Sequence, residues 1–279
     1  MLEQFSGATR VILILGDSIA QVKAPVGLTR EFERRGHHAI VVPLQLAVAD
    51  LDAGILALSR AKNVDGLIAT IPHKFAVAAR CATLSERAKF LGAINVARRN
   101  TDGSWHGDML DGEGFAAPLA RAGCEIKGNR ALLVGAGGGH AIALALLDRG
   151  VAQLAVHDLD TTRRDALIAK LDSNPGRVIA GCSDPADAGI VVNATPLGMK
   201  PGDPLPVDVS HPPPTAFVGD VVTVPEMTPL LAAAREKGCR IQTGVGMFGG
   251  NLGLMADFFA GAARCENGRS NLDDVRRWN

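Results

Sequence analysis

Residues 131–150 read ALLVGAGGGHAIALALLDRG, and this stretch decides the fold class. A short apolar run ends at Val134, a cluster of glycines follows, and an alanine-rich stretch comes directly after it. This order predicts a buried strand, a tight turn and a helix. The first N–H groups of such a helix lack partners and the helix dipole favours negative charge there, so a diphosphate can bind. The predicted dinucleotide site comprises Gly135, Gly137, Gly138, Gly139 and His140, with His140 in the place of the usual third glycine.

The next predicted strand ends on Asp158, which is followed by Leu159. A carboxylate at this position accepts hydrogen bonds from ribose hydroxyls and repels a 2′-phosphate, so NAD is favoured over NADP. Arg163 complicates this prediction, because an arginine can also reach a phosphate or stack on adenine. We assign all three residues to the cofactor site. Two plainer interpretations stay open: the glycines form only a tight turn, and Asp158 only caps the following helix.

Outward from this motif, short apolar runs alternate with amphipathic stretches along most of the chain. Strands are predicted at 10–15, 39–44, 66–70, 130–134, 153–158, 190–195, 216–220 and 240–243, and helices at 26–35, 49–62, 140–149, 161–171 and from 228 onward. The pattern predicts an α/β protein with a boundary near Gly112 and a doubly wound parallel sheet in the second part. The segment after Gly249 is expected to form terminal helices that pack back on the first part.

Composition excludes several function classes. The chain has 279 residues, and its 29 basic side chains balance 29 acidic ones, which leaves no net field to attract nucleic acid. Five dispersed cysteines without a CxxC pair predict no metal site and favour a reducing cytoplasm. The apolar run 11–15 is too short for a secretion signal or a membrane span. We expect a cytoplasmic protein without nucleic-acid or membrane partners, and the sequence leaves a homodimer open.

Several distinctive segments follow one another in a fixed order. They are GDSIAQVKAP (16–25), TIPHK (70–74), GAIN (92–95), GDMLDGEGF (107–115), GAGG (135–138), NATPLGM (193–199), DVVTVPEMTPL (220–230) and GVGM (244–247). Together they resemble the shikimate/quinate dehydrogenase family over nearly the whole chain. The resemblance implies a substrate domain of residues 1–111 completed by 249–279, a Rossmann domain of residues 112–248, and an active site in the cleft between them.

The resemblance also implies an NAD(P)-dependent oxidoreductase acting on a ring hydroxyl of a cyclic polyol or polyol acid. Lys74 and Asp111 match the family's catalytic lysine and aspartate. The assignment is chemically reasonable, because hydride leaves a carbinol carbon only as the hydroxyl proton departs to a nearby base. A facing carboxylate orients the hydroxyl and the ammonium group. For His73 we favour a loop or packing role.

Further positions take their roles from the same resemblance. Thr70, Asn95 and Asn251 match substrate-binding positions, although Thr70 can also be read as a strand-end turn and Asn95 as an Asx turn. The cofactor is expected to contact Asn193, Thr195, Pro196 and Leu197, with backbone at Val222, Gly244 and Met247 facing the nicotinamide.

The chain departs from the family where the substrate carboxylate would bind. The family's Ser-x-Ser-Pro element is replaced by Val22 and Ala24 before Pro25, and neither side chain can donate a hydrogen bond. A carboxylate therefore needs another anchor, for which Ser18, Gln21 and Lys23 are candidates. Other family positions are also changed, namely Ile68, Met109, Leu110, Thr223 and Asn251.

Three hypotheses follow from these departures. The first is an NAD-preferring enzyme with an altered carboxylate pocket. The second is an ordinary shikimate or quinate dehydrogenase with a compensating anchor. The third is a non-catalytic dinucleotide-binding sensor.

Overall fold

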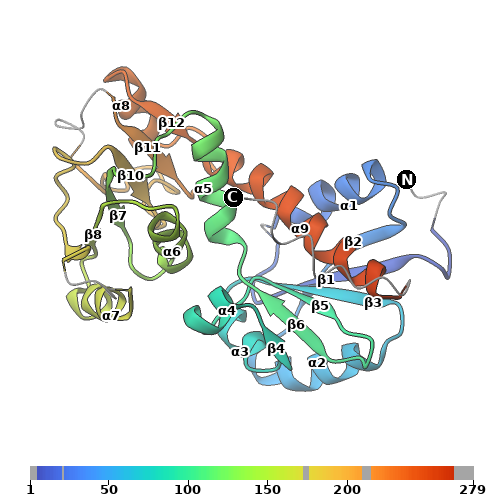
Figure 1. Ribbon diagram of the computed structural model, residues 1–279. Coiled ribbons are helices and arrows are strands. Elements are labelled where there is room, and N and C mark those ends of the chain that lie inside the picture. The colour runs from blue at the N-terminus through green and yellow to red at the C-terminus, as the bar shows by residue number, and fades with distance from the viewer. Residues whose placement is uncertain (1–4, 21, 172–175, 209–214, 267–279) are drawn as a thin grey trace. The chain divides into compact units, whose positions relative to one another are not determined.

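The computed structural model describes residues 5–20, 22–171, 176–208 and 215–266, and for 262–266 only the backbone. The chain divides into two compact units. Unit 1 comprises Met1–Leu110 and Leu252–Asn279, and unit 2 comprises Asp111–Asn251. Figure 1 labels the helices and strands of both units.

Unit 1 contains a mixed six-stranded sheet in the order β2-β1-β3-β5-β6-β4. Its strands are β1 (Arg10–Gly16), β2 (Ala39–Gln45), β3 (Val64–Ala69), β4 (Thr83–Leu84), β5 (Val96–Arg99) and β6 (Trp105–Asp108). β1 pairs in parallel with β2 and β3, whereas β5 runs antiparallel to β3 and to β6. The carboxyl ends of β1 and β3 consequently lie side by side at one edge.

The helices of unit 1 are short. They are α1 (Ala24–Arg34), the 3-10 turn η2 (Val48–Asp50), α2 (Leu51–Arg60), α3 (Lys74–Ala78) and α4 (Glu86–Leu91). Ser85 caps α4 by accepting the Ala88 N–H at 3.2 Å, and Gly92 ends the helix in the left-handed conformation that glycine adopts at little cost.

The C-terminal helix α9 (Gly244–Glu266) supplies part of the unit 1 core. Met255, Ala256 and Phe259 belong to the same buried cluster as Ile12 of β1 and Phe32 of α1. The sequence led us to expect terminal helices after Gly249, whereas between there and residue 266, where the described part ends, the structure has a single helix that starts earlier. Its glycine-rich first turns lower helix propensity, which concealed its beginning.

Unit 2 contains a six-stranded sheet in the order β12-β11-β10-β7-β8-β9, with every strand parallel to its neighbours. The strands are β7 (Arg130–Val134), β8 (Gln153–His157), β9 (Val178–Ala180), β10 (Ile190–Asn193), β11 (Phe217–Asp220) and β12 (Arg240–Gln242). Strand order reverses between β7 and β10, which is where doubly wound sheets bind ligands. The prediction of two α/β parts, the second of Rossmann type, is confirmed.

Helices cover both faces of this second sheet (Figure 1). Side chains of α5 (Asp111–Arg121), α6 (His140–Asp148) and α7 (Thr161–Leu171) form one core cluster, and those of α8 (Pro229–Glu236) form another on the opposite face. Within the described ranges, no helix combines the length and apolar character needed to cross a bilayer.

Candidate active site

The glycine loop after β7 meets the loop after β10 at the switch point of unit 2. Gly135 has a φ of 100°, and a Cβ at this position would lie 2.7 Å from Thr195 Cγ2. A Cβ on Gly138 would lie equally close, at 2.7 Å, to the carbonyl oxygen of Ala194. Only glycine fits at these two positions, because any side chain would collide with the neighbouring loop. The predicted residues 135–139 and 193–195 are thus brought together.

The glycine that allows α6 to pack on its strand is Gly139. A Cβ there would lie 2.6 Å from the Gly135 carbonyl oxygen and 2.8 Å from the side chain of Leu133. Position 140 therefore does not need to be glycine, and His140 begins the helix instead. Its Nδ1 donates to the Gly137 carbonyl at 3.0 Å. The unusual third position of the motif leaves the tight packing intact.

The side chain of Asp158 accepts a hydrogen bond from the backbone of the glycine loop. Its Oδ2 accepts the Ala136 N–H at 2.8 Å, and its Oδ1 accepts the Asp160 N–H at 2.9 Å. Asp160, which accepts the Arg163 N–H at 3.1 Å, caps α7 instead. The alternative interpretation of Asp158 as the helix cap is wrong, because Asp160 occupies that position.

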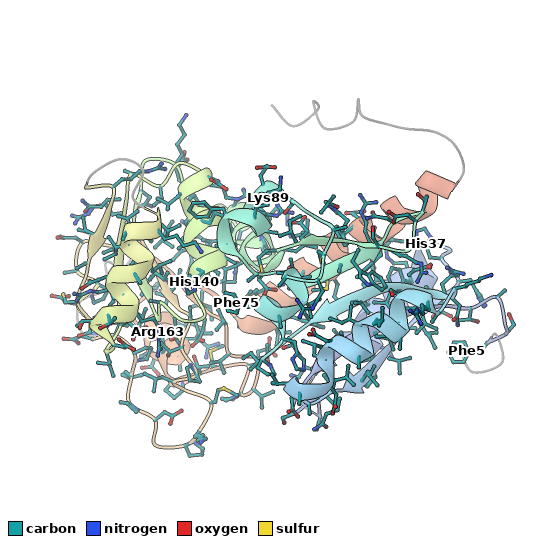
Figure 2. All side chains as sticks on the ribbon, turned by 90° about the horizontal axis from the view of Figure 1, so that it is seen from below. Phe5, His37, Phe75, Lys89, His140 and Arg163 are labelled. Atoms are coloured by element: carbon teal, nitrogen blue, oxygen red, sulfur yellow. The ribbon has the colours of Figure 1, made fainter. Side chains whose placement is uncertain are left out.

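Arg163 lies over the same loop. Its Nη2 is 3.3 Å from Asp160 Oδ2 and its Nη1 is 4.0 Å from Asp158 Oδ2. A Cβ on Gly137 would contact the arginine side chain at 3.4 Å. Figure 2 labels Arg163 and His140. Burial lowers the pKa of His140, and the charges of Lys170 and Arg163 lower it further. Leu159, between the two acidic residues, is 90% exposed.

Asn193 and Asp220 form a buried network that supports the cofactor-side loops. The Asn193 amide donates to Asp220 Oδ1 at 3.1 Å and to the Leu197 carbonyl at 3.1 Å. Its oxygen accepts from the Thr195 N–H and hydroxyl at 3.0 and 2.7 Å. With zero exposure, the Asn193 side chain holds the loop that carries Thr195, the exposed Pro196 and Leu197.

Sequence reasoning missed the role of Asp220. This fully buried carboxylate accepts from the Thr228 hydroxyl at 2.8 Å and the Val222 N–H at 2.9 Å. Burial raises the pKa of Asp220, and the hydrogen bonds from Val222, Thr228 and Asn193 oppose that rise. Thr228 also caps α8. The available signal was an acidic residue at the end of a buried strand, followed by Thr-Pro at a helix start.

The backbone positions expected near the nicotinamide are neighbours. A Cβ on Gly244 would lie 2.3 Å from the Val222 carbonyl oxygen, so glycine is required for the close approach of these two segments. Met247 follows in the first turns of α9 and packs against the large core cluster of unit 2. The side chain of Val222 is itself buried.

In unit 1, Lys74 begins α3 directly after the loop that follows β3. The carbonyl of Lys74 accepts the Ile94 N–H at 3.1 Å, which fixes the backbone. His73 is buried, and its Nε2 donates to the Leu46 carbonyl at 2.8 Å. His73 thus fastens the loop to its neighbour, in the packing role expected for it.

Thr70 and Asn95 lie beside this loop. The Thr70 N–H donates to the Leu15 carbonyl and the Asn95 carbonyl accepts the Ala69 N–H, both at 2.9 Å. Asn95 is 2% exposed, and its Oδ1 accepts the Leu110 N–H at 2.7 Å. That bond joins Asn95 to the segment directly before Asp111. It is not the bond of an Asx turn, in which the side chain would bind a backbone N–H two residues further on.

The loop after β1 reaches the same edge of the unit 1 sheet. The Asp17 N–H donates to the Ile71 carbonyl at 3.2 Å, and Ser18 is exposed with a φ of 57°. Val22 and Ala24 pack against the unit 1 core instead of presenting polar groups. Lys23 is exposed, and Gln21 lies outside the described residues.

A buried acidic group orders the segment that leads out of β6. Asp108 accepts from Arg87 at 2.7 and 2.5 Å, from Ser85, and from the Met109 N–H at 2.7 Å. Burial would raise the pKa of Asp108, but the hydrogen bonds from Arg87 and Ser85 outweigh burial and keep that pKa below its ordinary value.

In unit 2, Asp111 is the first residue of α5. The Asn251 Nδ2 donates to Asp111 Oδ1 at 3.1 Å. Two predicted functional residues, distant in sequence, are therefore paired within this unit.

Comparisons with known proteins identify the relatives of this chain. Residues 14–97 match the model of the shikimate dehydrogenase substrate binding domain. A shikimate dehydrogenase (NADP(+)) from Rubrobacter xylanophilus is 36% identical over 242 residues, which span 84% of this chain and 85% of the relative. The chain belongs to the shikimate/quinate dehydrogenase family. It is accordingly an NAD(P)-dependent oxidoreductase acting on a CH–OH group, as predicted, and the sensor hypothesis loses its support.

Other family members differ in cofactor. A quinate/shikimate dehydrogenase (NAD(+)) from Corynebacterium efficiens is 38% identical over 201 residues, 69% of this chain and 71% of the relative. The solved structure of quinate dehydrogenase from Corynebacterium glutamicum in complex with NAD has a TM-score of 0.83 and 30% identity, covering 91% and 94% of the two chains. Relatives of this shikimate/quinate dehydrogenase family member thus use NAD or NADP.

The residues present in unit 2 fit a nicotinamide dinucleotide. Gly137 and Gly138 are exposed at the start of α6, where backbone N–H groups can meet a diphosphate. Asp158 lies at the carboxyl end of the neighbouring strand, held by Ala136 as described. The fit rests on this exposed glycine loop, whose Gly135 and Gly138 permit the close approach of the loop after β10.

Proposed function

We propose that this protein oxidises a ring hydroxyl of a cyclic polyol, prefers NAD, and binds the carboxylate end of its substrate unlike its relatives. One observation carries the last point: Val22 and Ala24, at the positions of the family's two serines, pack on the unit 1 core. Burying a carboxylate against such groups costs several kcal/mol without compensation. Ile68 and Leu110, at two further altered positions, belong to the same apolar cluster.

The proposed chemistry converts a CH–OH group into a ketone. Residues 135–139 and Asp158 would hold the nicotinamide dinucleotide, which would supply the acceptor for the hydride of the carbinol carbon. Lys74 takes the hydroxyl proton, and Asp111 orients the reacting groups. The backbone hydrogen bond between Lys74 and Ile94 fixes the main chain from which the Lys74 side chain extends. A fixed position supports the proposed role, because a proton acceptor must be held in one place.

The substrate preference is tested by steady-state kinetics on shikimate, quinate and uncharged cyclic polyols. We expect a neutral polyol, or an acid with an altered carboxylate end, to give the highest kcat/KM. Turnover of shikimate with a micromolar KM would reject the altered pocket. In that case Ser18, Gln21 or Lys23 is the compensating anchor, and replacing the correct one would raise the KM of acids alone.

The role of Lys74 is tested with Lys74→Ala and a matched control, Lys89→Ala, whose side chain forms an exposed ion pair with Glu86. We expect Lys74→Ala to lower kcat by about 10²- to 10⁴-fold, the usual contribution of general acid–base catalysis. Dinucleotide affinity should stay unchanged, and Lys89→Ala should match the parent protein. Full activity of Lys74→Ala would refute the assignment.

The cofactor preference rests on Asp158. Its carboxylate is bonded to Ala136 and Asp160 at the end of β8, and this supports the proposal because a carboxylate at the end of this strand repels a 2′-phosphate. Titration with NAD and NADP should give the lower dissociation constant for NAD. Equal or tighter NADP binding would mean that Arg163 accommodates the phosphate despite its two acidic neighbours.

A further inference from the structure

Asn251 is an almost fully buried amide in the first half of α9. Its exposed fraction is 5%, and it is the last residue of unit 2. Its position matches one that carries a longer glutamine in the family, where the side chain binds substrate. The shorter asparagine has different surroundings here.

Two glycines bring the Asn251 amide against α5. A Cβ on Gly114 would lie 2.1 Å from Asn251 Oδ1, and a Cβ on Gly250 would lie 2.7 Å from the Gly114 carbonyl oxygen. Neither position can carry a side chain without moving one of the helices. The close approach places the amide one helical turn from Asp111, at the start of the same helix α5.

The amide makes one side-chain hydrogen bond and leaves one atom without any. Nδ2 donates to Asp111 Oδ1 at 3.1 Å, while Oδ1 is buried and has no hydrogen-bond partner in the described structure. A buried polar atom without a partner is destabilising and calls for an explanation. The carboxylate of Asp111 provides one: as an acceptor it binds the NH₂ group, and rotating the amide would bring two oxygens together.

We propose that Asn251 is a positioning residue that holds the carboxylate of Asp111 for the reaction, and that it does not contact the substrate. This inference rests on the proposed function, in which Asp111 takes part in catalysis. A substrate ligand would present its polar atoms at an accessible surface. Asn251 instead directs its donor to Asp111 and keeps its acceptor buried beside Gly114.

The test is a double-mutant cycle with Asn251→Ala and Asp111→Asn. Asn251→Ala should lower kcat about tenfold and leave the KM values of polyol and NAD unchanged. In the Asp111→Asn background the same change should alter kcat less than about twofold, because residues that act through one group are not additive. Asn251→Leu, which keeps the branching at Cγ but lacks the donor, should reproduce the effect.

Two controls separate positioning from misfolding. The dissociation constant of NAD, measured on each variant, reports whether unit 2 is folded and should not change. Asn129→Ala removes another amide of unit 2, whose side chain bonds to the backbone of Glu125 and Arg130, and should keep full activity.

Each other outcome counts against the proposal. A raised polyol KM with unchanged kcat would show direct substrate binding by Asn251. If the loss of kcat in the double variant equals the product of the two single losses, Asn251 and Asp111 act independently. If Asp111→Asn retains full activity, the catalytic assignment of Asp111 falls and this proposal with it. If only the Asn251 variants are fully active, the proposed function stands and this inference alone is refuted.

Discussion

The imidazole of His140 lies at the start of α6, beside the backbone that is expected to bind a diphosphate. Because the Gly137 carbonyl can only accept, Nδ1 carries the proton in this bond. Burial lowers the pKa of His140, as do the charges of Lys170 and Arg163, against the effect of the Gly137 hydrogen bond. The neutral ring is therefore favoured at neutral pH in the free protein.

Dinucleotide binding should consequently depend on pH. A bound diphosphate favours the imidazolium, so the pKa of His140 rises on binding. By linkage, the protonated His140 strengthens dinucleotide binding. This gain in affinity is complete below the pKa that His140 has in the free protein, and it is lost as pH rises through the higher pKa of His140 in the complex. We expect the NAD dissociation constant to fall about two- to fivefold between pH 8 and pH 5.5, a typical strength for a partly exposed charge pair. Calorimetric titration measures it.

The matched variant is His140→Asn, which can still donate to the Gly137 carbonyl but does not titrate. Its dissociation constant should show a flatter pH dependence across the same range. An unchanged pH dependence in His140→Asn would mean that another group is responsible.

At this scale the sequence identified the glycine loop and Asp158 because each belongs to a spaced pattern. It could not identify the pairing of Asn251 with Asp111, since residues far apart in sequence meet only through the close packing at Gly114 and Gly250. Nor could it show that Gly139 takes over the packing role of the third motif glycine.

Among the elements, the C-terminus of α2 is capped by a side chain from a strand that is distant in sequence. Arg99 of β5 donates to the carbonyls of Ala61 at 3.1 Å, Leu58 at 3.3 Å and Val64 at 3.5 Å, and also to that of Ser59. Leu58 and Ser59 belong to the last turn of α2, where carbonyls run out of partners further along the helix. The Leu58 carbonyl also accepts the N–H of the C-cap residue Ala61 at 3.2 Å. One guanidinium thereby joins α2, β3 and β5.

Replacing Arg99 should destabilise unit 1. We expect Arg99→Ala to lower the free energy of unfolding by about 1–3 kcal/mol, because several part-buried carbonyls lose hydrogen bonds from a charged donor. Urea denaturation followed by circular dichroism measures it. Arg60→Ala, an exposed arginine of the same helix, should change stability by about 0.5 kcal/mol or less. Equal effects of the two substitutions would contradict the capping role.

The same strand explains why sequence reasoning left the second half of the unit 1 sheet unassigned. β5 reads VARR and β6 reads WHGD, without the apolar run that marked β1 or β7, and β4 has only two residues. Short strands near a sheet edge are specified by their partners and by contacts such as those of Arg99, which a local pattern does not record.

Across the whole chain, the core of unit 1 is completed by residues more than 140 positions beyond β6. Phe259 is 6% exposed and its ring lies 6.3 Å from that of Phe32. A Cβ on Gly66 would lie 2.3 Å from the Phe259 ring, so β3 has a glycine where the ring packs on the sheet. The sequence led us to expect helices after Gly249 that pack back on the first part, and the structure shows which residues of the core α9 contacts.

Removing this ring should destabilise unit 1 severely. We expect Phe259→Ala to lower the free energy of unfolding by about 3–5 kcal/mol, the range for deleting a buried phenylalanine side chain. Trp105, 3% exposed in the same unit, is a suitable fluorescent probe once the chain's other tryptophan is replaced with Trp278→Phe. Phe5→Ala, which removes a 43% exposed ring from the same unit, is the control and should leave the urea midpoint nearly unchanged. A Phe259→Ala midpoint equal to that of the control would show that α9 adds little to the unit 1 core.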